Sequence, residues 1–148
     1  MKKYTLNFGQ FKQYKKEFLT AEKGIDGAAV TSVAFCGEAL YIATTENTFE
    51  YNEGSLKKLS FKAEKFFSEN GRLYAAFGKV LSEIKNGKAK KLAEFDSKIV
   101  DVSVALDGSF WLVTEETLYL NESGAFKEVV GLPSAVVAVA ALDNKAKY

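Results

Sequence analysis

The chain has 148 residues, 47% hydrophobic and 26% charged, which is typical of one soluble globular domain. Its 20 basic and 19 acidic residues give a net charge of +1, which excludes a general electrostatic attraction to nucleic acid or to an anionic membrane. Histidine is absent and Cys36 is the only cysteine, so the commonest zinc ligand, the commonest general base and any intrachain disulfide are excluded.

The first 20 residues carry part of a repeating pattern. Gly9-Gln-Phe-Lys-Gln-Tyr14 matches the residues that follow the turn glycine of later segments, so residues 1–20 are predicted to form the second half of a four-stranded unit. An amphipathic helix over FKQYKKEFL, with Phe11, Tyr14 and Phe18 on one face, is the alternative.

The N-terminal lysines are not followed by a continuous apolar segment, so no signal peptide or transmembrane helix is readable. We therefore expect a cytoplasmic protein, with a piece cut from an exported protein as the alternative.

Three longer segments of similar pattern follow, over residues 28–60, 63–93 and 98–130. Within each, apolar residues alternate at period two and glycine or asparagine marks the turns, which predicts a four-stranded antiparallel meander. In each segment an aromatic residue is followed, at the same spacing, by a turn glycine. These pairs are Tyr41 and Gly54, Tyr74 and Gly87, and Trp111 and Gly124.

The first strand of a unit is rich in small residues. In VTSVAF, IVDVSVAL and VVAVAAL, valine alternates with alanine or serine, as expected where strands crowd around an axis. Four-stranded units of this length are the signature of β-propeller blades. The predicted fold class is therefore all-β, a β-propeller-like array of four-stranded antiparallel meanders in a single domain over residues 1–148. A plain antiparallel sandwich is the alternative.

Residues 133–148 match the first half of a unit, with Tyr148 at the position of Tyr41 and Trp111, so the chain stops within a unit. The uncharged strand VVAVAAL would leave a bare edge if it were unpaired. We therefore expect self-association through the terminal strands. Closure of one chain into a four-unit ring and a fragment of a longer propeller are the alternatives.

Several of these residues together resemble a known family. Gly131-Leu-Pro-Ser134, Asp107-Gly-Ser-Phe-Trp-Leu-Val-Thr114 and Leu118-Tyr119 are similar to the two-component regulator propeller repeats of bacterial hybrid kinase sensor domains. The resemblance covers nearly the whole chain and implies a partial propeller of about three whole units plus two half-units. A fragment of a larger sensor protein is a further alternative, because nothing here resembles a kinase or a DNA-binding unit.

A propeller scaffold is expected to bind its partners at the loops between strands. The candidate ligand- or partner-binding residues in such loops are Asp26, Glu46, Asn47, Lys79, Asp96 and Glu116.

The expected function is a non-catalytic binding or protein-interaction module. No nucleophile has a base partner in the sequence, so we expect no catalytic residue. We also expect no metal site, no cofactor, and neither nucleic acid nor membrane as a partner. A propeller-type lyase or hydrolase is the alternative, but the strands nearest the axis present valine, alanine and serine. Trp111, like Tyr41 and Tyr74, is expected to be buried between neighbouring units.

Overall fold

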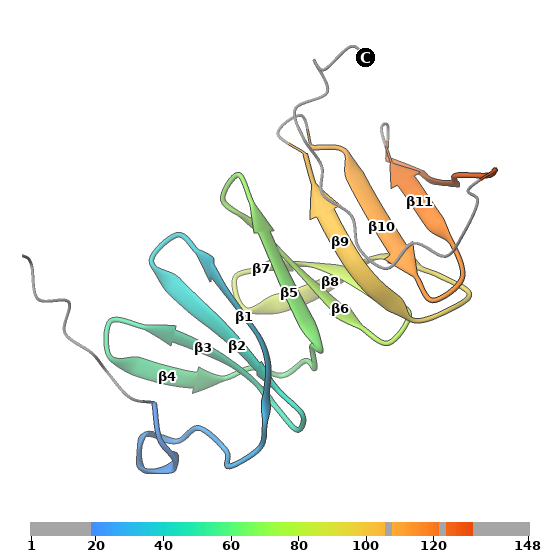
Figure 1. Cartoon of the computed structure of the whole chain (residues 1–148). Coiled ribbons are helices and arrows are strands. Elements are labelled where there is room, and N and C mark those ends of the chain that lie inside the picture. The colour runs from blue at the N-terminus through green and yellow to red at the C-terminus, as the bar shows by residue number, and fades with distance from the viewer. Residues whose placement is uncertain (1–18, 106–107, 122–123, 132–148) are drawn as a thin grey trace, which may run out of the picture.

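A computed structural model describes residues 19–105, 108–121 and 124–131, which form a row of three sheets (Figure 1). Apart from Leu19 and Thr20, the predicted terminal half-units and the N-terminal helix alternative lie outside the described residues.

Each sheet has four strands that pair in chain order and run antiparallel to their neighbours. The first sheet contains β1 (Val30–Cys36), β2 (Ala39–Thr44), β3 (Thr48–Asn52) and β4 (Ser55–Lys58). The second contains β5 (Lys65–Glu69), β6 (Arg72–Phe77), β7 (Val80–Lys85) and β8 (Lys88–Glu94). The third contains β9 (Ile99–Val104), β10 (Phe110–Thr114), β11 (Leu118–Asn121) and β12 (Phe126–Glu128).

Only one short 3₁₀ turn, η1 (Ala21–Lys23), interrupts this pattern in the described part of the chain. The predicted fold class, an all-β array of four-stranded antiparallel meanders, is confirmed. No helix among the described residues is long and apolar enough to cross a membrane.

The strand registers place the three repeated aromatic residues at the same position of their sheets. Tyr41 lies opposite Ala34 and Glu50, and Tyr74 lies opposite Phe67 and Glu83. In the third sheet, the corresponding partners of Trp111 are Ser103 and Leu120. The spacing in the sequence therefore reflects a true structural repeat.

Local turn chemistry sets the register of the hairpin formed by β7 and β8. Asn86 and Gly87 connect β7 to β8 with φ values of 52° and 69°, both in the left-handed region. Two consecutive left-handed residues are the geometry of the tight hairpin turn that Asn-Gly favours. The turn thereby holds Lys85 opposite Lys88 and fixes the pairing as far as Ser82 and Lys91, beyond which the register shifts by one residue.

The sheets pack face to face. We call the face of a sheet that points toward the N-terminal end of the row its near face, and the opposite face its far face. Between the first two sheets lies a buried cluster of Ala43, Ala63, Phe66, Leu73, Ala75 and Ile84. Between the second and third lies another cluster, formed by Tyr74, Ala76, Leu81, Phe95, Ile99, Val102 and Leu112. The core is therefore a series of layers between sheets.

In the first and second sheets, the aromatic residue on the far face contacts the next sheet. Tyr41 packs on Phe66 and Tyr74 on Phe110, with ring centroids 5.9 and 4.8 Å apart. Of the three aromatic residues expected to be buried between units, only Tyr74 is buried, because Tyr41 and Trp111 are both only partly buried. Trp111 lies on the far face of the third sheet, and no described sheet follows it.

Candidate functional site

The six predicted binding residues all lie along one edge of the array. Because neighbouring strands are antiparallel, the segments that enter each first strand and the loops between the second and third strands share this edge. We call it the connector rim. Asp26 precedes β1, Glu46 and Asn47 connect β2 to β3, and Lys79 connects β6 to β7. Asp96 lies between β8 and β9, and Glu116 between β10 and β11.

Asp26 and Asn47 come together at the first sheet. The side-chain amide of Asn47 donates a hydrogen bond to Asp26 Oδ2, and Thr44 Oγ1 lies 3.2 Å from the same carboxylate oxygen. Thr44 Oγ1 also accepts the backbone N–H of Asn47 at 2.9 Å. These bonds anchor the segment that enters β1 to the loop between β2 and β3.

Glu46 and Glu116 occupy equivalent loops with similar geometry. Their backbone N–H groups lie 3.3 Å from Thr44 Oγ1 and 3.4 Å from Thr114 Oγ1, and both side chains are exposed. A threonine followed by a short polar loop therefore forms the same turn in the first and third sheets.

Lys79 and Asp96 lie away from the Asp26 cluster. Lys79 Nζ forms an ion pair with Glu94 Oε1 at 3.3 Å, and Lys91 pairs with the other oxygen of the same carboxylate. Hydrogen bonds from these two lysines lower the pKa of Glu94. Asp96 is exposed beside a separate hollow of about 400 Å³ that Phe95, Tyr119 and Phe126 help to line. The predicted residues thus share a rim but do not form one site.

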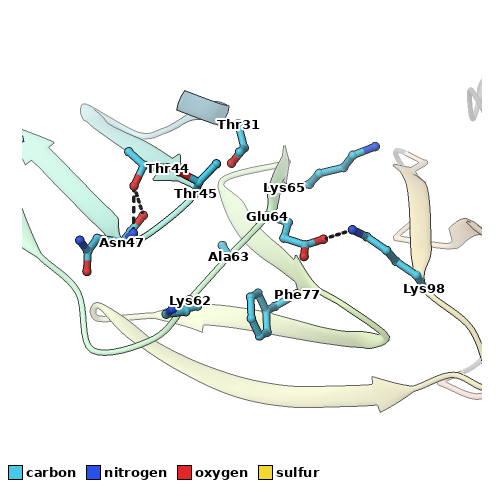
Figure 2. Close-up of a pocket in the computed structure, with 10 residues that line it drawn as sticks. All are labelled: Thr31, Thr44, Thr45, Asn47, Lys62, Ala63, Glu64, Lys65, Phe77 and Lys98. Atoms are coloured by element: carbon cyan, nitrogen blue, oxygen red, sulfur yellow. Dashed lines mark hydrogen bonds and ion pairs between the residues drawn. The ribbon is translucent and has the colours of Figure 1, made fainter. Parts of the chain in front are cut away.

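The most promising cavity on this rim is a groove of about 390 Å³ between the first two sheets, which we call the connector groove (Figure 2). Its lining comes from both sheets and from the segment that enters β9. The lining residues are Thr31, Thr44, Thr45, Asn47, Lys62, Ala63, Glu64, Lys65, Phe77 and Lys98. Only Asn47 belongs to the predicted set.

The connector groove carries an excess of positive charge, since its lining includes three lysines and one carboxylate. Glu64 Oε2 pairs with Lys98 Nζ at 2.8 Å, and this hydrogen bond raises the pKa of Lys98 (Figure 2). Lys65 donates to the backbone carbonyl of Val100. Lys62 forms no ion pair with any described residue.

The arrangement suits a ligand with carboxylates and hydrogen-bonding groups. Lysine ammonium groups attract carboxylates as point charges, and the exposed hydroxyls of Thr31 and Thr45 can donate or accept. Phe77, which is exposed, adds an apolar surface on the same groove.

Sequence reasoning missed the lysines of this groove. Lys62 lies three residues before the start of β5, Lys65 is its first residue, and Lys98 directly precedes β9. Basic residues at the entry to a first strand were therefore a local signal. That Lys65 and Lys98 line the same groove depends on packing between sheets.

No protein-family model and no curated protein sequence matches the chain. Several solved structures do. The computationally designed Ika4 protein matches with a TM-score of 0.65 and 13% identity, over 82% of this chain and 84% of Ika4. The WD40 repeats of RRP9 match with a TM-score of 0.60 and 12% identity, over 81% of this chain and 44% of that one.

A third match is YCF48, solved bound to D1 peptide, with a TM-score of 0.53 and 14% identity. The match covers 67% of this chain and 39% of the YCF48 chain, so this chain spans less than half the length of both the RRP9 WD40 chain and the YCF48 chain. At these identities the likeness shows the fold alone, and it places the chain in the class of propeller-like proteins.

Proposed function

We propose that the chain is a non-catalytic binding module that holds an acidic peptide segment in the connector groove. The observation that carries this proposal is the composition of the groove, whose lining holds three lysines and one glutamate beside threonine and asparagine side chains. Such a surface complements carboxylates and the polar groups of a peptide backbone.

The size of the groove supports a short segment as the ligand. Small-molecule sites enclose roughly 300–1,000 Å³, and the connector groove, at about 390 Å³, lies near the lower end of this range. It has room for a few side chains of an extended peptide. Lys62, which has no ion pair among the described residues, is the cation best placed to contribute binding energy without first breaking a pair.

The scaffold is compatible with this role, because YCF48 shares the propeller-like fold and was solved with a bound peptide. The resemblance of DGSFWLVT and GLPS to two-component regulator propeller repeats supports a finer proposal. In that case the chain is part of a sensor, and the groove recognises the segment that the sensor detects.

Selection from a random peptide display library tests the proposal. We expect enrichment of peptides rich in aspartate and glutamate. The Lys62→Glu variant should weaken binding of a selected peptide by about tenfold or more, equivalent to about 1.4 kcal/mol.

Lys88→Glu is the matched control, since it makes the same charge change at an exposed position of β8, outside the groove. It should leave the affinity unchanged. Enrichment without a charge preference, or an equal loss in both variants, would contradict the proposed site.

A further inference from the structure

A second pocket, separate from the connector groove, lies between the second and third sheets. It encloses about 250 Å³ at the opposite rim, where hairpin turns join the first strand of a sheet to the second and the third to the fourth. We call it the turn-rim pocket. The second sheet contributes Arg72, Glu83 and Leu92 to its lining, and the third contributes Phe110, Asn121 and Phe126.

Arg72 departs from the repeat. It lies two residues before the repeated aromatic of its sheet, where the other two sheets have the small, buried residues Ala39 and Ser109. Arg72 is exposed and is the only arginine of the chain. It forms no ion pair with any described residue, including Glu69, its partner across the hairpin of β5 and β6. The fold of a unit therefore does not require a cation at this position.

Asn121 is a second departure from the repeat, and it comes from the neighbouring sheet. It lies three residues before the turn glycine, where the other two sheets have Tyr51 and Ile84, whose side chains are larger and mainly apolar. Asn121 Oδ1 accepts the backbone N–H of Gly124 at 2.8 Å, so its NH₂ group is the part that can donate to a ligand. Two polar departures thus meet in one pocket, as expected for a functional site.

Glu83 supplies a negative charge to the same pocket. Its side chain is buried, and its Oε1 lies 3.1 Å from the exposed ammonium of Lys85. A carboxylate offers about four acceptor positions on its two oxygens, so Glu83 can accept from a ligand ammonium beside Lys85. Glu50 is the equivalent residue of the first sheet, so it is the combination of Glu83 with the two departures that is particular to this pocket.

Aromatic and aliphatic side chains form an apolar wall of the pocket. The rings of Phe110 and Phe126 are partly buried, with centroids 5.9 Å apart, and Leu92 is an exposed apolar residue of β8. All three line the pocket. Burial of an apolar group of a ligand against this wall would contribute binding free energy.

We propose that the turn-rim pocket binds a free α-amino acid with an apolar side chain. Arg72 and Asn121 donate hydrogen bonds to its carboxylate, for which the fork of the guanidinium is well suited. Glu83 accepts from its ammonium group, and its side chain packs on the apolar wall. The volume of about 250 Å³ lies below the roughly 300–1,000 Å³ of sites for drug-sized molecules, in keeping with a ligand of this size.

This site is independent of the connector groove. An internal peptide segment has no ammonium and carboxylate on one carbon, so an acidic peptide lacks the pair of charges that the turn-rim pocket complements. Loss of binding at one site should leave binding at the other unchanged.

Amide chemical-shift titration of the isotope-labelled full chain with leucine tests the proposal. We expect changes at Gly108, Asn121 and Gly124 in the turn-rim pocket, without changes at Thr31 and Thr45 in the connector groove. N-acetylleucine lacks the ammonium and leucinamide lacks the carboxylate. Each should bind about tenfold more weakly than leucine or worse, because one charged hydrogen-bonding partner is lost.

Two variants assign the charges. Arg72→Gln should weaken leucine binding about tenfold or more and remove the preference for leucine over leucinamide. Glu83→Gln should instead remove the preference for leucine over N-acetylleucine. Lys58→Gln is the control, since it removes a cation at an exposed position of β4 outside the pocket, and it should leave the affinity unchanged.

Three results would overturn the proposal. The first is that leucine, valine and phenylalanine at millimolar concentration cause no changes in the turn-rim pocket of the folded wild type. The second is equal affinity for leucine and its two derivatives. The third is an Arg72→Gln variant that binds leucine as the Lys58→Gln control does, and this comparison decides the matter even if Glu83→Gln does not fold, because Arg72 is exposed.

Discussion

The ring of Tyr74 in β6 meets the ring of Phe110 in β10 edge to face, with centroids 4.8 Å apart and ring planes at 84°. This contact joins the far face of the second sheet to the near face of the third. Tyr74 is 3% exposed, so its ring is enclosed by the layer between the two sheets. Such contacts between rings add to the stabilisation from apolar burial.

Truncation of the Tyr74 side chain should therefore strongly destabilise the fold. We expect Tyr74→Ala to lower the free energy of unfolding by about 3–5 kcal/mol, as for other large buried aromatic residues. Trp111→Ala should cost clearly less, because Trp111 is only partly buried. Urea unfolding of both variants under conditions that keep the chain monomeric measures the difference, and equal losses would show that Trp111 is enclosed as Tyr74 is.

The hairpin turn between β7 and β8 should be sensitive to a side chain at its glycine. Gly87 has a φ of 69°, a conformation that disfavours L-residues by roughly 1–2 kcal/mol. Gly87→Ala should destabilise by about this amount. Gly27→Ala is the matched control, because Gly27 is not left-handed and no atom lies within 4 Å of its added Cβ. Thermal melts of the two variants check the prediction, which fails if both melt alike.

The hydrogen bonds of Asp26 should stabilise the entry to β1. Asp26→Ala removes the acceptor of Asn47 and the contact with Thr44, so we expect a loss of about 1–3 kcal/mol. Glu46→Ala is the control, since the exposed Glu46 contributes to the same loop through its backbone N–H. Chemical denaturation measures both, and a near-zero effect of Asp26→Ala would show that this anchor is unimportant.

Ionisation of Tyr41 should make the free energy of unfolding depend on pH under alkaline conditions. Burial, together with the charge and the hydrogen bond of Glu50, raises the pKa of Tyr41 from 10.0 to about 12. Between these values the unfolded chain releases the Tyr41 proton while the folded chain retains it, so stability falls as the pH rises. Below pH 10 this group has no such effect.

Tyr41→Phe removes the ionisable group and should lessen the fall in stability between about pH 10 and 12. Urea unfolding at a series of pH values, with wild type and variant side by side, measures the change. Phenolate absorbance that arises from Tyr41 near its ordinary pKa would contradict the environment described for it.

The sheets were predictable because their signals are local. Period-two alternation and turns such as Asn86-Gly87 depend on residues close in the chain, and the common spacing from Tyr41, Tyr74 and Trp111 to the next turn glycine revealed the repeat. The antiparallel order of the strands also predicts which loops lie together at the connector rim.

The connector groove and the partial burial of Trp111 were not predictable in the same way. Lys62 and Lys98 line one groove only because the sheets that follow them pack beside each other. Burial of Trp111 depends on whether another sheet covers its face, which no pattern around that residue specifies.

The most direct test of the proposed binding role is amide chemical-shift mapping of the isotope-labelled chain during titration with an oligoglutamate peptide. The proposal predicts changes at Thr31, Thr45, Asn47, Lys62 and Lys98, which line the connector groove, and unchanged signals at Gly37 and Gly71 on the opposite rim. An oligolysine peptide should cause no such changes. Shifts concentrated on the opposite rim, or identical responses to both peptides, would contradict acidic-peptide binding in the groove.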